Sequence, residues 1–381
     1  MTFTLHRSQS SGSSPRRGSL KTAHGAIETP FFMPIATKGA VKTLSSADMA
    51  GLGAGILLSN TYHLYMRPGL EIMQKAGGLH RFMNWSGPIL TDSGGYQVFS
   101  LSKMRTLSEQ GVEFQSPWDG SKHMLTPEKS IAIQQTLGSD IVMAFDECPP
   151  YPCEKKYAHE AVERTTRWAQ RSQEQFQQKI ADQPNRGQLL FGIVQGSVYA
   201  DLRAQSAREL QAIGFDGYAI GGLAVGEPTE SMYETLASTL EELPADKPRY
   251  LMGVGKPENI VQAVRLGVDM FDCVIPSRNA RHGLAYVWRE KNAASDSAAA
   301  PKSAPLSGAA FYETVHITNE KNKTAFTVLD SACGCLACGG GYTRAYLHHL
   351  FRVGEALGQR LLTAHNIKFY LDLMTRLKGA I

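Results

Sequence analysis

The sequence predicts an α/β protein built on a (β/α)8 barrel (a TIM barrel), with a smaller cysteine-containing subdomain towards the C-terminus. Three observations lead to this prediction: eight short apolar runs alternate with segments of helical spacing, polar residues follow several of these runs directly, and three cysteines cluster within residues 333–338. With 381 residues, of which 43% are apolar and 19% charged, the chain belongs to the globular class. This composition excludes a disordered, collagen-like or coiled-coil protein.

The expected strands are short apolar or β-branched runs, too short for buried helices. We expect them at residues 31–34, 55–59, 88–91, 140–145, 189–194, 217–220, 250–254 and 268–274. Helical spacing separates most of them, at residues 127–137, 158–180, 198–213, 231–243 and 257–266. Eight alternating units favour a barrel over a doubly wound sheet, although periodicity alone is compatible with both.

The region after the eighth run is organised differently. Strand-like segments at 284–288 and 312–317 flank an Ala/Ser/Pro/Lys-rich stretch at 290–310 that has no periodicity, and two helices are expected at 343–357 and 364–377. We therefore expect a flexible N-terminal tail at 1–16, a catalytic barrel at 17–290, a flexible insertion at 291–310, and a subdomain with the closing helices at 311–381.

Charge and apolar runs limit the partners and the compartment. No apolar run approaches the roughly 18 residues that cross a bilayer, so no membrane partner is expected. The first 17 residues lack the apolar segment of a secretory signal, which predicts a cytoplasmic protein. A net charge of only +4 permits a nucleic-acid partner but does not require one.

Polar groups stand where several expected strands end. They are Asn60, Asp92, Asp146, Gln195, the pair Gly221 and Gly222, and Asp272. Because the carboxyl ends of barrel strands meet at one mouth, these groups would gather there. Each one alone could be a helix cap or a turn residue, and Asp146 could equally accept hydrogen bonds from a purine edge or cap the next helix. Three carboxylates at one mouth favour an active site.

Two motifs carry candidate chemistry. In residues 91–97 (TDSGGYQ), Asp92 offers a proton-transfer group and Tyr96 a stacking face, although the segment could also be a plain turn. In residues 271–281, Asp272 precedes a loop with Arg278 and Arg281, whose guanidinium groups suit phosphates or base edges. An ion-paired surface turn is the alternative for this second motif.

Cys333, Cys335 and Cys338 have the spacing of metal ligands, because thiolates two and three residues apart converge on one tetrahedral ion. The candidates for a fourth ligand are His348, His349 and His365. Three sulfurs and one imidazole would leave no position for water, which predicts a structural Zn²⁺ rather than a catalytic one. An iron–sulfur cluster or three unligated thiols are the alternatives.

Six segments in chain order resemble the tRNA-guanine transglycosylases: 60–64 (NTYHL), 91–97, 145–148 (FDEC), 192–196 (GIVQG), 221–225 (GGLAV) and 271–281. The similarity runs from about Arg17 to the C-terminus and is interrupted near 290–330. It implies a barrel enzyme that replaces guanine at the wobble position (G34) of tRNAs with GUN anticodons (Asp, Asn, His, Tyr) by a 7-deazaguanine precursor of queuosine. It also implies a homodimer and no ATP or redox cofactor.

The resemblance also implies the roles of individual residues. Asp272 resembles the nucleophile that attacks C1′ of the ribose and forms a covalent intermediate, and Asp92 resembles the general acid/base. Groups that match purine-binding positions are Asp146, Gln195, Gly222, Leu223, Tyr96 and Met252. Those that match tRNA contacts are Arg278, Arg281 and Lys256. The zinc ligands implied are Cys333, Cys335, Cys338 and His365, with His348 and His349 as lesser alternatives.

The incoming base is inferred from the likeness of the pocket. Cys148 and residues 223–225 resemble the bacterial enzymes, which implies the small aminomethyl base preQ1 rather than queuine or preQ0. An archaeal-type relative with another incoming base is the first alternative. A non-catalytic RNA-binding subunit is the second, and the presence of both Asp92 and Asp272 argues against it.

Overall fold

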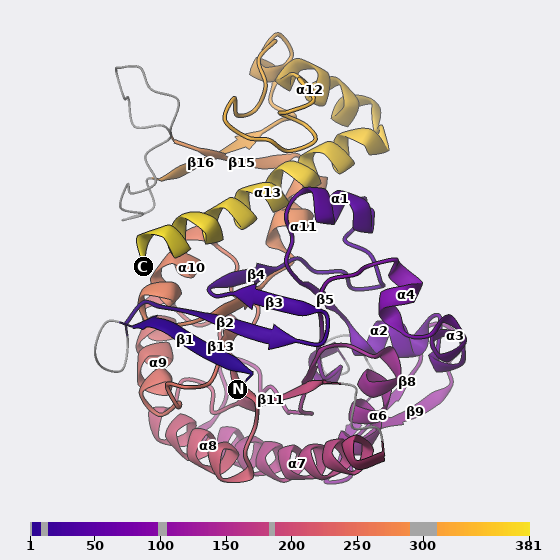
Figure 1. The fold of residues 1–381 in the computed structure, drawn as a ribbon, viewed down its shortest axis with the longest axis vertical. Coiled ribbons are helices and arrows are strands. Elements are labelled where there is room, and N and C mark those ends of the chain that lie inside the picture. The colour runs from indigo at the N-terminus through magenta and orange to yellow at the C-terminus, as the bar shows by residue number, and fades with distance from the viewer. Residues whose placement is uncertain (1, 9–13, 98–104, 183–186, 290–310) are drawn as a thin grey trace.

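The computed structural model describes residues 2–8, 14–97, 105–182, 187–289 and 311–381, and shows a barrel with a subdomain at its side (Figure 1). All eight predicted runs contribute a strand to one parallel sheet. The strands are β4 (Phe31–Met33), β5 (Leu57–Ser59), β6 (Ile89–Thr91), β10 (Ile141–Met143), β11 (Leu189–Val194), β12 (Gly217–Ile220), β13 (Arg249–Leu251) and β14 (Met270–Asp272). Their order is β4-β14-β13-β12-β11-β10-β6-β5.

The two ends of this strand order meet and close the ring. Ile35, just after β4, forms a parallel bridge with Leu58 of β5. The Leu58 amide donates to the Pro34 carbonyl at 3.0 Å, and the Leu58 carbonyl accepts from the Ala36 amide at 2.6 Å. The predicted (β/α)8 barrel is thereby confirmed.

The strands are buried on both faces, which explains their continuous apolar runs. Phe31 and Met33 belong to the cluster inside the barrel, whereas Phe32 between them packs with the surrounding helices. Ile141 and Met143 repeat this alternation, with Val142 facing outward. The period of two that defines a strand is therefore present in β4 and β10, although every position of these two strands is apolar.

A small antiparallel sheet covers the end of the barrel at which the strands begin. It consists of β1 (Phe3–Ser8), β2 (Arg16–Thr22) and β3 (Gly25–Glu28). Phe3, Leu20 and Ile27 join the cluster inside the barrel. The expectation of a flexible tail at 1–16 is therefore wrong for Phe3–Ser8, which pairs with β2, and for Arg16, which is buried and donates two hydrogen bonds to Asp269 at 2.9 and 2.7 Å.

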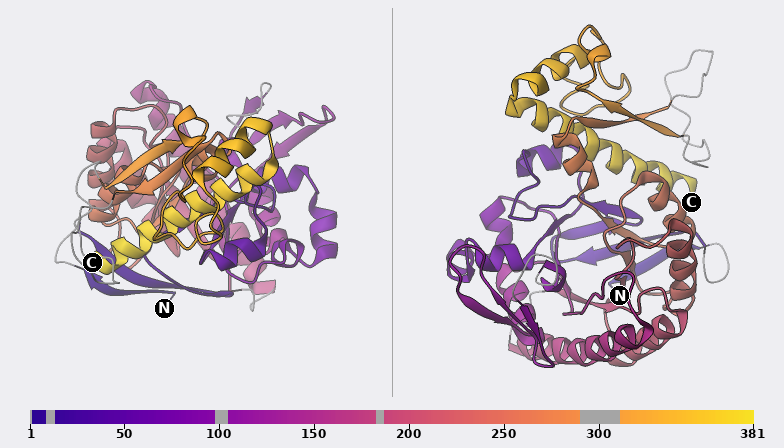
Figure 2. Two further views of the ribbon diagram at one scale, coloured as in Figure 1. Left: turned by 90° about the horizontal axis from the view of Figure 1, so that it is seen from above. Right: turned by 180° about the vertical axis from the view of Figure 1, so that it is seen from behind.

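The five predicted barrel helices form, and several short elements join them. The predicted ones are α6 (Pro127–Leu137), α7 (Lys155–Asp182), α8 (Ala200–Ile213), α9 (Thr229–Glu241) and α10 (Pro257–Arg265). The short helices α1 (Ser46–Gly51), α2 (Thr61–Met66), α3 (Leu70–Ala76) and α4 (Leu79–Met83) and the sheet of β7 (Arg105–Leu107), β8 (Val112–Gln115) and β9 (Lys122–Leu125) were not predicted. The view from behind in Figure 2 shows that the helices surround the strands.

The C-terminal region returns to the barrel through one long helix. Its elements are α11 (Ile275–Arg281), β15 (Leu284–Trp288), β16 (Tyr312–His316), the 3-10 helix η1 (Glu320–Asn322), α12 (Arg344–Val353) and α13 (Ala356–Ala380). The prediction of helices at 343–357 and 364–377 needs correction, because α12 ends at Gly354 with a φ of 77° and α13 begins at Ala356. The proposed insertion 291–310 lies outside the described residues.

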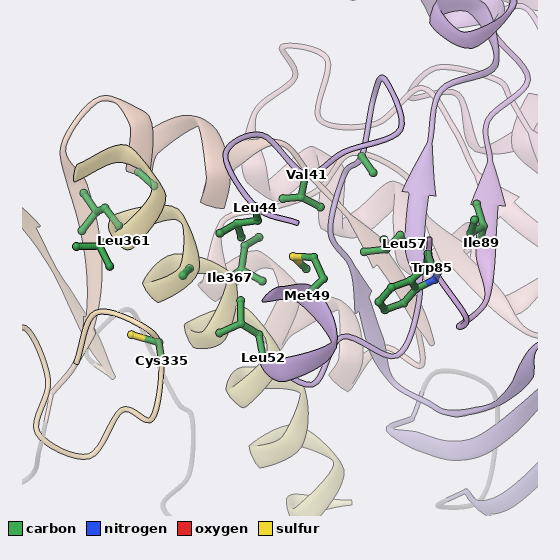
Figure 3. Close-up of a cluster of buried hydrophobic side chains, with 14 of the residues drawn as sticks. Val41, Leu44, Met49, Leu52, Leu57, Trp85, Ile89, Cys335, Leu361 and Ile367 are labelled. Atoms are coloured by element: carbon green, nitrogen blue, oxygen red, sulfur yellow. The ribbon is translucent and has the colours of Figure 1, made fainter. Parts of the chain in front are cut away.

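The subdomain and the barrel share one hydrophobic cluster. In Figure 3, Ile367 of α13 lies beside Leu44, Met49 and Leu52. Leu361 and Cys335 belong to the same cluster on the subdomain side, and Leu57 and Ile89 continue it into the barrel strands. The subdomain is thus joined to the barrel by apolar packing. None of the helices in the described part of the chain combines the length and apolar character needed to cross a bilayer.

Candidate active site and metal centre

A cavity of about 400 Å³ opens where the barrel strands end, in the size range of small-molecule sites. All eight residues predicted to act on the base or the ribose line it: Asp92, Tyr96, Asp146, Gln195, Gly222, Leu223, Met252 and Asp272. They lie at or just after the ends of six different strands, which is how a barrel assembles a site. The structure therefore brings this predicted set together.

Asp92 follows β6 and is held by the start of α2. Its Oδ1 accepts the Thr61 amide at 2.9 Å and its Oδ2 accepts the Asn60 side-chain amide at 2.5 Å. Asn60 is itself fixed because its oxygen caps α2 at the amide of His63. Burial raises the pKa of Asp92 to about 7, these hydrogen bonds oppose the rise, and the charge of Asp272 adds to it. A carboxyl group that titrates near neutral pH can both donate and accept a proton.

Asp272 is the last residue of β14 and is 9% exposed. Its Oδ1 accepts the Tyr250 hydroxyl at 2.6 Å and the Gly253 amide at 2.8 Å. Gly253 has a φ of 74°, which favours glycine at this position. Burial raises the pKa of Asp272, and both hydrogen bonds lower it by stabilising the ionised form. The carboxyl groups of Asp92 and Asp272 are thus held by different hydrogen-bond donors.

Asp146 lies at another wall of the cavity, beside Gln195. Its Oδ1 accepts the Ser93 hydroxyl at 3.1 Å and its Oδ2 accepts the Gln195 side-chain amide at 2.8 Å. Burial raises the pKa of Asp146 to about 6, and the charge of Glu147 contributes. A Cβ built on Gly222 would come within 2.6 Å of the Gln195 side chain, and the φ of Gly222 is 65°. Glycine at this position therefore lets the backbone approach Gln195 and the cavity closely.

The predicted tRNA contacts lie outside the lining of the cavity. Lys256 is exposed at the N-cap of α10, and Arg278 is exposed on α11. Arg281, on the same helix, donates to the Ser277 carbonyl at 2.8 Å, and burial together with the charge of Arg278 lowers its pKa. Because α10 and α11 follow β13 and β14, this positive charge stands beside the mouth.

The predicted metal ligands meet in the subdomain. The sulfurs of Cys333, Cys335 and Cys338 lie 3.7, 3.6 and 3.4 Å from His365 Nδ1. The four ligand atoms lie within 4.8 Å of one another, a spacing that fits one tetrahedral metal ion. His365 Nε2 lies 2.7 Å from the Tyr286 carbonyl, to which it can donate, and this leaves Nδ1 free as a ligand.

The alternative fourth ligands are not part of this cluster. The Nδ1 of His348 lies 2.9 Å from the Ile317 carbonyl, and His349 is exposed. The four-residue cluster includes neither of them. The structure thus agrees with His365 as the fourth ligand.

A second group of possible ligands, His24, His80 and Asp140, does not suit a metal ion. The two imidazole rings are stacked, with centroids 3.7 Å apart and an interplanar angle of 15°. Ring nitrogens donate within the ring plane, and one ion cannot lie in both of these parallel planes. Asp140 instead accepts the amides of His24 and Ile89 at 3.1 and 2.9 Å, so the group connects three segments of the chain.

Sequence reasoning missed several supporting residues. Tyr250 and Ser93 donate to predicted carboxylates, and Glu227 accepts the backbone amides of Ala224 and Val225 at the rim of the cavity. Tyr250 reads in the sequence only as one more apolar position of a strand. Ser93 stands within the TDSGGYQ motif, so its place beside Asp92 was the one available signal.

The fold and the site define the class: an enzyme with a (β/α)8 barrel whose carboxyl groups, with raised pKa values, share a cavity at the barrel mouth. A family model described as "Queuine tRNA-ribosyltransferase" matches residues 11–381. The chain belongs to this family and is a ribosyl-transferring enzyme.

Individual relatives agree with the family model. The queuine tRNA-ribosyltransferase of Desulforudis audaxviator is 50% identical over 373 residues, which cover 98% of this chain and 92% of the relative. That of Vibrio parahaemolyticus is 51% identical over 366 residues, covering 96% and 89%. That of Pelotomaculum thermopropionicum is 48% identical over 382 aligned positions, covering 100% and 94%.

Proposed function

We propose that this protein exchanges the guanine at the wobble position of GUN-anticodon tRNAs (Asp, Asn, His, Tyr) for preQ1, as a step of queuosine biosynthesis. The observation that carries the proposal is the pairing of Asp92 and Asp272 in one cavity, where burial, with a smaller contribution from the charge of Asp272, raises the pKa of Asp92. Family membership supports tRNA and a purine-like base as the substrates.

The first half of the reaction breaks the bond between the ribose and guanine. Asp272 attacks C1′ of the ribose, the bond from C1′ to N9 breaks, and a ribosyl–aspartate ester forms. Asp92 in its protonated form donates to the departing guanine, which leaves as a neutral base. Tyr250 and Gly253 support this role because their hydrogen bonds favour the ionised form of Asp272.

The second half uses the same two groups in reverse. Asp92, now ionised, removes the proton from N9 of preQ1, and N9 attacks C1′ and releases the Asp272 carboxylate. The configuration at C1′ is retained after two displacements. A pKa of about 7 suits Asp92 to both proton transfers.

Recognition of the base is assigned to other residues that line the same cavity. Asp146 accepts from the purine N–H groups, Gln195 and the backbone of Gly222 and Leu223 contact the purine edge, and stacking falls to Tyr96 and Met252. All six line the cavity. Fixed polar groups at the edge of a base, with side chains packed on its two faces, are a general solution for holding a single base.

Zn²⁺ is the metal proposed for the cluster of Cys333, Cys335, Cys338 and His365, because three thiolates and one imidazole are a preferred donor set of structural zinc. When bound, the ion would link the loop of the three cysteines to α13. With four protein ligands it has no open position, so no step of the reaction passes through it.

We assign tRNA contacts to Lys256, Arg278 and Arg281, whose charge stands beside the mouth and suits phosphates. A homodimer is supported by exposed aromatic rings of the subdomain. Tyr342 and Tyr346 stack with centroids 5.7 Å apart, and Phe326 is 76% exposed. Exposed apolar groups that gather on one region are typical of an interface.

Guanine washout tests the proposal. A GUN-anticodon tRNA with radiolabelled guanine at the wobble position is incubated with enzyme and unlabelled preQ1, using wild type, Asp272→Asn and the control Asp246→Asn, an exposed carboxylate before β13. Label should leave the tRNA with wild type and the control but stay with Asp272→Asn, whose fold and metal content should be unchanged. Label retained with wild type would contradict the activity. Faster washout by queuine or preQ0 would contradict the choice of base.

A further inference from the structure

Arg203 is a fully buried cation of α8 that holds the backbone on both sides of Gln195. Its side chain is 0% exposed. Nε donates to the Ser197 carbonyl at 2.8 Å and Nη1 donates to the Val194 carbonyl at 3.2 Å. A planar guanidinium can reach two acceptors in a fixed geometry, which a lysine ammonium cannot reproduce.

The turn that Arg203 holds has an unusual backbone. Gly196 has a φ of 138° and Ser197, a residue with a Cβ, has a φ of 51°. Such conformations cost free energy and persist only where neighbouring groups hold them. The Gln195 amide also donates to the Ser206 hydroxyl at 3.2 Å, so α8 supports this turn at two of its residues.

Two buried polar atoms beside this turn have no hydrogen-bond partner among the described residues: Arg203 Nη2 and Gln195 Oε1. Both border Gly222, because a Cβ built there would lie 3.6 Å from Nη2 and 2.6 Å from Oε1. An unpaired buried donor and acceptor are costly, and such pairs in native proteins call for a functional explanation. Here Gln195 belongs to the lining assigned to base recognition, and Arg203 lies next to it outside that lining.

We propose that Arg203 is a positioning residue that sets the affinity of the enzyme for the purine base, an inference that rests on the proposed function. Through the carbonyls of Val194 and Ser197 it fixes the direction of Gln195 and the place of Gly222. Its spare N–H is available to Gln195 Oε1 when the amide moves from Asp146 to a bound base. Arg203 itself is not among the residues that line the cavity, so its effect would pass through Gln195 and Gly222.

Steady-state kinetics separate this role from a merely structural one. Arg203→Lys keeps the positive charge but loses the planar guanidinium group, and Arg203→Met removes both. Each should raise KM for preQ1 about tenfold, the equivalent of about 1.4 kcal/mol, while kcat at saturating preQ1 and KM for tRNA change less than about twofold. Arg249→Lys is the matched control, because Arg249 is also buried but lies at the opposite end of the barrel strands.

A milder variant keeps the inference testable if the arginine variants fail to fold. Ser206→Ala removes only the partner of the Gln195 amide, and should raise KM for preQ1 in the same direction by a smaller factor. An unchanged KM for preQ1 in these variants, or equal rises for preQ1 and tRNA, would overturn the role of Arg203. Wild type that releases no guanine would instead overturn the proposed function itself.

Discussion

The hydroxyl of Tyr250 donates to Asp272 Oδ1 at 2.6 Å from the neighbouring strand of the barrel. Both residues belong to paired strands, β13 and β14, so the distance between their side chains depends on the strand register and not on a loop. Removing the hydroxyl tests its contribution to the nucleophile directly.

We expect Tyr250→Phe to fold normally, because the ring lies in the apolar interior, and to reduce kcat about tenfold. The lost hydrogen bond lowers the pKa of Asp272 in the wild type, so the variant should have a higher pKa. The acidic limb of its pH–rate profile should therefore move to higher pH. An unchanged profile would show that the hydroxyl does not stabilise the carboxylate.

The pKa of about 7 for Asp92 predicts opposite pH dependences for the two half-reactions. Guanine release needs the protonated form, so single-turnover formation of the covalent intermediate should slow as pH rises through 7. Capture of preQ1 needs the ionised form and should slow as pH falls through 7. Rapid-quench assays with labelled tRNA measure both steps, and parallel profiles would contradict the assignment of Asp92.

Gly222→Ala should weaken base binding strongly. The added Cβ would lie 2.6 Å from Gln195 Oε1, and the φ of 65° strains any residue with a side chain. We expect KM for preQ1 to rise at least about tenfold, with little change in KM for tRNA. Gly138, the C-cap of α6, has a φ of 74° and its Cβ would meet nothing within 4 Å, so Gly138→Ala is the control for backbone strain alone.

Loss of the metal should loosen the subdomain. Metal analysis of the purified protein should find about one zinc per chain, and His365→Ala should abolish it and lower the melting temperature. His349→Ala is the control, because His349 is exposed on the neighbouring helix and lies outside the ligand cluster. Full metal content in His365→Ala would refute the ligand assignment.

The sequence predicted the barrel because strands buried on both faces appear as continuous apolar runs. The sheet β7–β9 was not predicted, because it is half exposed and has no continuous apolar run. In β8, only Val112 and Phe114 are buried. The start of α13 was missed because Gly358 interrupts the helical pattern. That glycine has a packing reason, since a Cβ there would lie 3.0 Å from Leu350 of α12.

The parts of the candidate site that could be predicted are polar side chains at the ends of apolar runs, because the sequence itself shows both the residue type and the position. Asp92 and Asp272 are two of them. The residues that hold the site in place were not predictable. Tyr250 reaches Asp272 through the strand register, and Arg203 holds the turn at Gln195. Hydrogen bonds between distant segments leave no local pattern in a sequence.

The rings of Phe32 in β4 and Tyr370 in α13 lie 5.0 Å apart. Tyr370 also donates its hydroxyl to the Gly255 carbonyl, so α13 fills the place beside the first and last strands of the barrel. During translation the N-terminal strands emerge long before this helix exists. Until α13 leaves the ribosome, the apolar surface that it covers on the barrel stays exposed. Chaperones that bind exposed apolar surface would act on the nascent chain during this period.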